Sequence, residues 1–184
     1  MMVPETTLMI PIMTQIADSL DADTFRRVLG HFATGVTVIT TRDADGRPIG
    51  MTASSFNSVS LDPPLVLWSL ARQASSHAAF ASARYWAVHV LAEEQETLSR
   101  RFSSRDIDRF AGLDWLAGHG GTPLLAGCAA RFECEIASLY DGGDHTIFLG
   151  RVLAVEQGEA AKPLVFHGGR YRHLATVSEA PRPA

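Results

Sequence analysis

The sequence is poor in the features that mark secreted, membrane-spanning or zinc-binding proteins. Only two of its 184 residues are cysteines, Cys128 and Cys134, and they do not form a CxxC pair. Two thiols without a recognisable secretory signal indicate a reducing compartment rather than a disulfide framework, and their spacing does not suggest a zinc site. No apolar run approaches the roughly 18 residues that a membrane-spanning helix needs. We therefore expect a cytoplasmic protein that does not cross a membrane.

Two further absences narrow the choice of function. The formal net charge is -4, which argues against non-specific binding of nucleic acid, because that binding depends on a basic surface. The GxGxxG fingerprint is missing, and so is the regular alternation of strands and helices found in dinucleotide-binding α/β folds. A nucleotide cofactor bound by this chain would therefore need a different kind of cradle.

What the sequence does contain is a series of short apolar strands, several of them joined by tight turns. Hydrophobic residues make up 46% of the chain, enough for one sizeable core. The pattern predicts one domain over 21–175, an N-terminal arm or tail at 1–20 and a disordered tail at 176–184. The domain should be mainly β, an antiparallel closed or partly closed barrel with a few peripheral helices. The predicted strands are 36–41, 49–54, 65–70, 85–91, 130–140, 145–155 and 164–166, and the predicted helices are 23–35, 77–83 and 93–102.

Several single residues have specific roles in this pattern. Asp23 is the expected N-cap of the first helix, because its side chain can accept a hydrogen bond from a free backbone N–H. Cys134 falls on the inner face of its strand, and Gly150 predicts a bulge or a close approach inside the next one. His89 lies within a strand, where a lone histidine is typical of a satisfied core or surface group. The glycine-rich segment 110–123 is predicted to be a long loop.

The most unusual stretch runs from Gly50 to Pro64 and reads GMTASSFNSVSLDPP. Six of its side chains can donate a hydrogen bond without carrying a charge, which suits a ligand rich in acceptors, although such runs more often form turns or sheet edges. We expect the stretch to begin on a strand and to continue as a loop, with pairing resuming only at Leu65, because prolines cannot donate to a ladder. The six side chains are those of Thr52, Ser54, Ser55, Asn57, Ser58 and Ser60.

Two other places could hold an anionic group. Ser75 and Ser76 precede a short helix, with Arg72 nearby, and could bind a phosphate there; capping of the helix is the commoner role. The second place is a small basic cluster, for which a solvated face balanced by neighbouring aspartates is the alternative interpretation. The cluster consists of Arg100, Arg101 and Arg105, and the aspartates are Asp106 and Asp108.

Taken in order, these segments resemble one family. HFATGVTVITT, TASSFNSVSLDPPLV, DGGDHTIFLGRV and PLVFHGGRY occur in the order and at roughly the spacing of the short-chain NAD(P)H:flavin reductases, which are the reductase components of two-component flavin-dependent monooxygenases. The resemblance covers about Phe25 to His173. It implies a split β-barrel of Greek-key type, a homodimer with two sites at its interface, and reduction of free FMN or FAD by NADH or NADPH.

The resemblance also implies which residues contact the cofactors. His145 falls on a histidine associated with nicotinamide binding, and it is the one candidate for a catalytic residue. Ser76 falls where the family holds phosphate, although a Ser-x-Thr pair common in relatives is replaced here by Ser75-Ser76-His77. The implied flavin contacts in the serine-rich stretch are Thr52, Ala53, Ser54, Ser55, Ser58 and Ser60. Those outside it are Ser76, Arg101, Phe102 and Tyr171.

The implied reaction requires little chemistry from the side chains. Hydride passes from the nicotinamide to the flavin, and the cofactors carry the reactivity. The protein must stack the two rings, exclude water and place donors where the reduced flavin gathers negative charge. Two alternatives stay open: a non-catalytic flavin- or haem-binding barrel, and an oxidase of the pyridoxamine-phosphate type, which would need more fixed cationic phosphate ligands near the serine-rich stretch.

Overall fold

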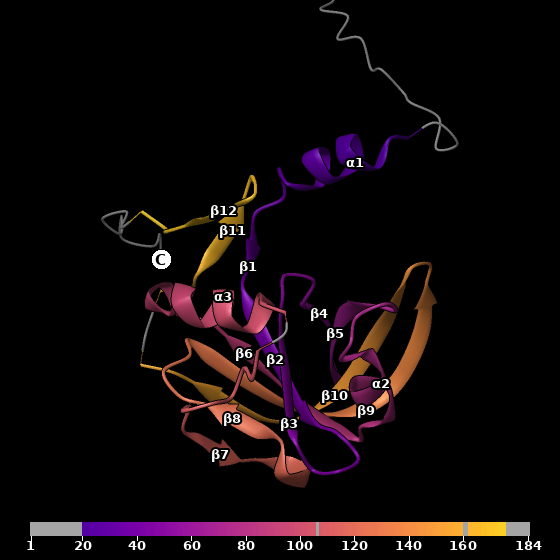
Figure 1. The fold of residues 1–184 in the computed structure, drawn as a ribbon, viewed down its shortest axis with the longest axis vertical. Coiled ribbons are helices and arrows are strands. Elements are labelled where there is room, and N and C mark those ends of the chain that lie inside the picture. The colour runs from indigo at the N-terminus through magenta and orange to yellow at the C-terminus, as the bar shows by residue number, and fades with distance from the viewer. Residues whose placement is uncertain (1–19, 106, 160–161, 176–184) are drawn as a thin grey trace, which may run out of the picture.

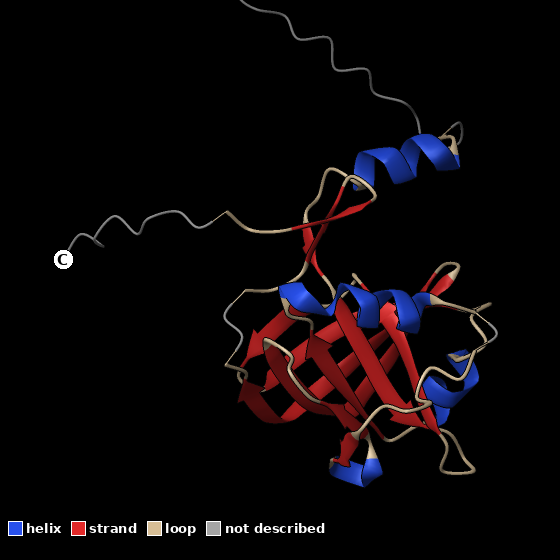
Figure 2. Cartoon of the chain, turned by 60° about the vertical axis from the view of Figure 1, so that its left-hand side comes forward, coloured by secondary structure: helices blue, strands red, loops and turns tan. Residues whose placement is uncertain are grey.

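A seven-stranded antiparallel sheet that curls into a barrel makes up most of the protein (Figures 1 and 2). The computed structural model describes residues 20–105, 107–159 and 162–175. Every pair of neighbouring strands in the sheet is antiparallel, which confirms the prediction of a mainly β, antiparallel fold. From edge to edge the strands are β3 (Pro48–Ala53), β2 (Thr37–Arg42), β6 (Tyr85–Val90), β9 (Ala130–Gly142), β10 (His145–Gln157), β5 (Pro64–Ala71) and β4 (Asn57–Leu61).

The serine-rich stretch contains a strand that the sequence did not reveal. Residues expected to form a loop pair with β5 as β4, so the prediction that pairing resumes only at Leu65 is wrong. Pro63 lies in the turn, and Pro64 is the first residue of β5, a position that tolerates a missing N–H. The ladder is irregular between Ser58 and Ser60. The polar stretch therefore ends at an edge of the sheet.

Two small sheets complete the β structure. In one, β11 lies between β1 and β12, and this sheet projects from the barrel (Figure 1). The other is a hairpin inside the segment predicted to be a long loop, and that prediction is wrong. Its strands are three residues long, too short to show a period in the sequence. The bounds are β1 (Thr34–Gly35), β11 (Val165–His167), β12 (Arg170–Arg172), β7 (Trp115–Ala117) and β8 (Pro123–Leu125).

The first helix starts and ends differently from the prediction. Asp21, not Asp23, is its N-cap, because Asp21 accepts a hydrogen bond from the Thr24 N–H at 2.9 Å. Its last residue is Leu29, and the helix is closed by Gly30 rather than by Gly35. The other two helices lie at the predicted places, and a short 3₁₀ turn precedes the last of them. The bounds are α1 (Ala22–Leu29), α2 (His77–Ser82), η2 (Glu93–Gln95), α3 (Glu96–Ser103) and η3 (His119–Gly121).

The barrel interior is filled by stacked aromatic rings. Trp68 stacks on Phe148 at 4.5 Å between ring centroids and meets Trp86 edge-on at 6.0 Å. Cys134 is fully buried in the same cluster, as predicted for the inner face of its strand. A second cluster lies beneath α3 and includes Phe102, which lines the cavity described below. The residues in contact with a ligand there thus rest on a packed core.

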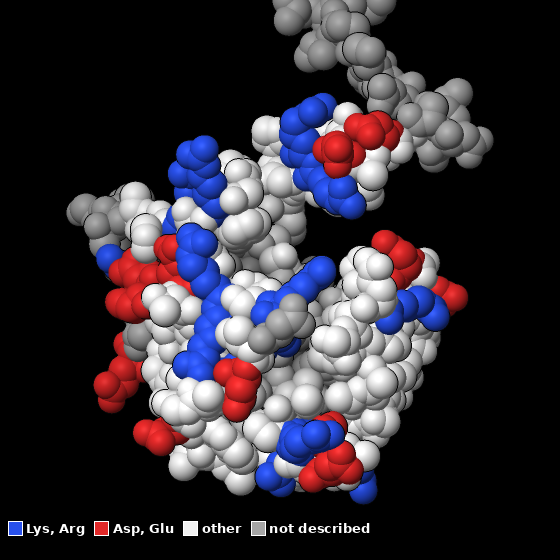
Figure 3. Space-filling model, in the orientation of Figure 1, with Lys and Arg blue, Asp and Glu red and all other residues white. Residues whose placement is uncertain are grey.

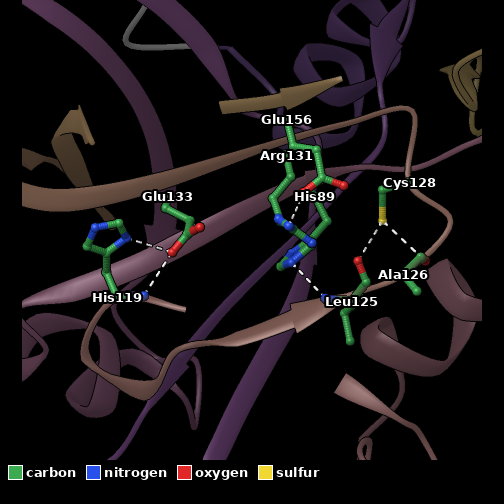
Figure 4. Close-up of polar contacts among 8 residues, drawn as sticks. All are labelled: His89, His119, Leu125, Ala126, Cys128, Arg131, Glu133 and Glu156. Atoms are coloured by element: carbon green, nitrogen blue, oxygen red, sulfur yellow. Dashed lines mark hydrogen bonds and ion pairs between the residues drawn. The ribbon is translucent and has the colours of Figure 1, made fainter. Parts of the chain in front are cut away.

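His89 is a satisfied core histidine, as predicted. It is fully buried, and its Nδ1–H donates to the Val38 carbonyl at 3.0 Å. Its Nε2 accepts from the Leu125 N–H at 3.0 Å (Figure 4). Both ring nitrogens are therefore used by backbone when the ring is neutral. Burial lowers the pKa of His89 to about 4.

Gly150 is both a bulge and a point of close approach, as predicted. The β9–β10 register shifts between Leu149 and Gly150, and a methyl group on Gly150 would lie 2.7 Å from Trp86 Cη2. We expect Gly150→Ala to lower the free energy of unfolding by about 1–3 kcal/mol, because the ring must move in a packed core. Urea unfolding measures this. Gly35→Ala is the matched control, since a methyl group there meets nothing within 4 Å, and equal losses in both variants would contradict the steric argument.

No helix among the described residues is long and apolar enough to cross a membrane. The expected tails, 1–20 and 176–184, lie outside the described residues except for Leu20, and the domain boundaries at 21–175 stay a prediction.

Candidate flavin site

A cavity of about 500 Å³ opens between β3, the end of β5, the segment that leads into α2, and the end of α3. The strands β3 and β5 come close here without being neighbours in the sheet, so the cavity lies where the barrel is split. Its lining is mostly polar and, among the described residues, contains no carboxylate. The lining residues are Met51, Thr52, Ala71, Gln73, Ala74, Ser75, Ser76, Phe102, Ser103, Arg105 and Arg109.

Three of the predicted flavin-contacting residues meet in this cavity. Thr52 uses its hydroxyl hydrogen for the Ser99 carbonyl at 2.6 Å, so its oxygen offers a ligand lone pairs only. Ser76 makes no capping bond to α2, and its Oγ lies 3.8 Å from Met51 Sδ. The commoner role of Ser76, capping, is therefore not seen, and its hydroxyl donates instead to a sulfur, which is a weak acceptor. The ring of Phe102 is fully buried and supports the cavity from below.

The other members of the serine-rich stretch do not line the cavity. Ser55 Oγ donates to the Ser69 carbonyl at 3.1 Å and accepts from the Ser69 N–H at 2.9 Å, so it ties the segment after β3 to β5. Ala53 is almost completely buried, and Ser54 is exposed. Their predicted contacts with flavin stay predictions. The same holds for the two serines on β4, Ser58 and Ser60.

The arginines predicted to form one cluster separate into different environments. Arg100 pairs with Glu96 at 2.6 Å and lies 5.0 Å from the Tyr171 ring centroid. This exposed ion pair fits the alternative interpretation of the cluster, a solvated face. Arg101 donates to the Ala111 carbonyl, while its buried Nε has no partner within the described part of the chain. Arg105 lines the cavity. Of the two expected aspartate partners, Asp106 lies outside the described residues and Asp108 accepts from the Phe110 N–H instead.

Arg109 is a site residue that sequence reasoning missed. Its Nε and Nη2 donate to the Ser104 carbonyl at 3.0 and 2.7 Å, and its Nη1 donates to the Gly50 carbonyl at 2.7 Å. No carboxylate of the described residues lies within ion-pair distance of this guanidinium. Partial burial lowers its pKa, yet an arginine stays protonated. The cavity wall therefore holds a positive charge that no described acid balances, on a face where Lys and Arg gather over α3 (Figure 3).

Tyr171 does not line the cavity but contacts Ser99, which in turn contacts the wall residue Thr52. Its hydroxyl is 2.9 Å from Ser99 Oγ, and Ser99 in turn accepts from Thr52. Ser99 is fully buried and carried no signal in the sequence. This chain of contacts joins the projecting hairpin β11–β12 to β3, so Tyr171 can position the wall without reaching into the cavity of its own chain.

His145 lies at the rim rather than inside the cavity. It pairs across the ladder with Ala71, which lines the cavity, and its Nδ1 is 2.7 Å from Asp144 Oδ1. The hydrogen bond from His145 lowers the pKa of Asp144. The turn is fixed further because the Arg72 N–H donates to the Asp144 carbonyl at 2.9 Å. The predicted nicotinamide contact of His145 stays a prediction.

A hollow of about 580 Å³ lies elsewhere, beside Cys128 and Arg131. It shares no lining residue with the first cavity. Burial raises the pKa of the Cys128 thiol to about 11, so the thiolate is scarce at neutral pH, and Arg131 is paired with Glu156 (Figure 4). Although this hollow is larger, it lacks what the first cavity has, an arginine that no described carboxylate balances.

Comparison with known proteins agrees with this placement. Residues 29–175 match the flavin reductase-like domain, and the chain belongs to this family. The flavin-dependent monooxygenase reductase subunit HsaB of Rhodococcus jostii is 43% identical over 167 residues, covering 91% of this chain and 85% of the relative. The FMN reductase (NADH) SmoA of Agrobacterium fabrum is 50% identical over 147 residues, covering 80% and 83%.

A solved structure shows the same fold. The NADH:FAD oxidoreductase SgcE6 of Streptomyces globisporus, in complex with NAD and FAD fragments, is 43% identical with a TM-score of 0.82, and the match covers 90% of this chain and 100% of that one. These comparisons confirm the predicted family and split-barrel fold. They also confirm the predicted class of enzyme, an NAD(P)H:flavin oxidoreductase, with FMN or FAD and a reduced nicotinamide nucleotide as its cofactors.

Proposed function

We propose that the cavity of Thr52, Ser76 and Arg109 is where this enzyme binds a free flavin and has it reduced by NADH or NADPH. The observation that carries the proposal is the charge of Arg109, which no described carboxylate balances, beside Ser76, whose hydroxyl donates only to the weak acceptor Met51 Sδ. A guanidinium and a hydroxyl donor together suit a flavin phosphate.

The remaining wall suits the rest of a flavin. Thr52 and Met51 present the edge of β3, and the buried Phe102 ring keeps that edge in place. Flavin and nicotinamide supply the hydride chemistry when they are bound. The side chains of this site hold and orient the rings, and the lack of a carboxylate among the described lining residues favours an anionic ligand. Apart from the arginines at the phosphate end, the cavity offers only neutral contacts, and such modest contacts allow the reduced flavin to dissociate as the product.

The test is NADH and NADPH oxidation by purified protein, with and without added FMN and FAD. We expect oxidation that depends on added flavin in at least one of the four pairings. Absence of turnover in all four would contradict the proposal and favour the non-catalytic binding protein.

We further propose that the reduced flavin passes to a separate monooxygenase in the cytoplasm. The relative from Rhodococcus jostii is a reductase subunit of such an enzyme, and the flavin reductase BorF is a component of a two-component tryptophan halogenase. Both cysteines of this chain are free and buried, which supports a reducing compartment.

A homodimer is the proposed assembly, and α1 supports it. This helix stands away from the barrel (Figures 1 and 2), and none of its residues is buried. An isolated helix of eight residues is unstable in water unless its apolar face packs on something. A second copy can supply that surface through a two-fold axis. The exposed apolar residues are Phe25, Val28 and Leu29 on α1 and Phe32 just after it.

We expect light scattering to give twice the chain mass of 19.9 kDa. Phe32→Asp, at a side chain that is 74% exposed in the single chain, should shift the mass toward the monomer, because a carboxylate is costly to bury. Leu116→Asp, on β7 and 71% exposed, is the control and should leave the dimer intact. A monomer mass for the unchanged protein at micromolar concentration would refute the assembly.

A further inference from the structure

A second, smaller cavity continues from the proposed flavin site. Its volume is about 230 Å³, and Ser75, Ser76 and Arg109 belong to the walls of both cavities. The two spaces therefore meet at the residues proposed to hold the flavin phosphate. A ligand anchored at Arg109 could extend past it without leaving the protein surface.

The two ends of this continuous space differ in chemistry. The junction has the guanidinium of Arg109 and two serine hydroxyls. The far part is mostly apolar, bounded by Pro48, Ile49, Ile107 and Phe110, with Asp108 as the one carboxylate among its described lining residues. A cationic junction followed by an apolar slot fits a pyrophosphate followed by a purine nucleoside, since a base is flat and apolar on its faces and a pyrophosphate needs charge-assisted donors.

The slot is held open by close packing beneath it. Phe110 is nearly buried and meets Phe102 edge-on, with 5.1 Å between ring centroids. Both rings lie against Gly50, where a methyl group would be 2.5 Å from Phe102 Cε1. Arg109 Nη1 reaches the Gly50 carbonyl at 2.7 Å and fastens the segment after α3 to β3. A preformed slot needs little ordering when a ligand enters it.

We propose that the second cavity binds the adenosine half of FAD, with the pyrophosphate at Arg109, and that the enzyme consequently prefers FAD to FMN. The inference rests on the proposed flavin site and adds the choice of flavin to it. Asp108 supports the assignment, because one carboxylate oxygen is held by the Phe110 N–H at 2.9 Å and the other can accept from a ribose hydroxyl.

Calorimetric titration of the full chain with FMN, FAD and ADP, without nicotinamide nucleotide, tests the preference. We expect FAD to bind about tenfold tighter than FMN or better, as an added apolar contact and pyrophosphate would give. ADP should compete with FAD. Equal affinities for the two flavins, or no displacement of FAD by ADP, would overturn the inference.

A substitution at the mouth of the slot tests whether the adenosine half binds there. Ile107 is 52% exposed, so Ile107→Ala should leave the fold unchanged while weakening FAD and ADP by about threefold or more, through the loss of apolar contact, with FMN unaltered. Leu116→Ala, at a similarly exposed leucine on β7, is the control. Equal weakening of FMN and FAD by Ile107→Ala would place the adenosine elsewhere.

Different results would refute the adenosine site and the proposed reaction. FMN-dependent NADH oxidation without a preference for FAD would refute the adenosine site alone. Tight FAD binding without any turnover would refute the proposed reaction and leave the site standing. If ADP competes with NADPH in turnover but not with FAD in the titration, the cationic junction serves the nicotinamide nucleotide and the inference fails.

Discussion

Lowering the pH from 6.5 toward 4 is expected to remove roughly 3 kcal/mol from the free energy of unfolding, at 1.36 kcal/mol per pKa unit. The cause is His89. Burial lowers its pKa from 6.5 in the unfolded chain to about 4 in the folded protein. Between these values the unfolded state binds a proton that the folded state does not, so stability falls as the pH falls.

Urea unfolding at a series of pH values within that window measures the effect. His89→Gln is the matched variant: it should be less stable throughout, and its stability should change much less across the window. The aspartates with lowered pKa, among them Asp43 and Asp144, start from an ordinary pKa of 3.8, so they act below the window. The pKa of Glu133 is lowered from 4.5, so this group adds only at the acidic end of the window, and it does so in both proteins. A stability that stays constant from pH 6.5 to 4.5 would show that His89 is not held neutral.

The sequence predicted strands well where the chain has long apolar or β-branched runs. VTVITT gave β2, and the alternation from Ala130 onward gave β9. It failed for β4 and for the β7–β8 hairpin. The polar residues of β4 sit at a sheet edge, where no buried face imposes a period, and the hairpin strands have three residues each. Such strands exist because a neighbouring strand pairs with them, which local sequence does not show.

The candidate site was predictable only in part, for a related reason. The serine-rich stretch included Thr52, and the serines before the short helix included Ser76; both residues do line the cavity. The serine-rich stretch also included Ser55, whose hydroxyl is used to tie β5 to the segment after β3. Arg109 was missed because its role depends on reaching Gly50, 59 residues earlier in the chain. Ser99 was missed because its partner Tyr171 lies 72 residues later.

Replacement of Arg109 by glutamine should separate phosphate binding from ring binding. We expect Arg109→Gln to weaken FMN by about 10- to 140-fold, which corresponds to the roughly 1.5–3 kcal/mol of a hydrogen bond to a charged group. Riboflavin has the same ring and ribityl chain without the phosphate. Its affinity should change by less than about threefold, since only the neutral contacts remain in question.

Two further variants distinguish the charge of Arg109 from its structural contacts. Arg109→Lys keeps the charge and loses the fork of donors to Ser104 and Gly50, so FMN binding should fall less than in Arg109→Gln while the melting temperature falls in both. Arg105→Gln removes the other cavity arginine and should weaken FMN more modestly, because that side chain is exposed and screened by solvent. If Arg109→Gln weakens riboflavin as much as FMN, Arg109 acts only by fastening the segment after α3 to β3, and the phosphate must bind elsewhere.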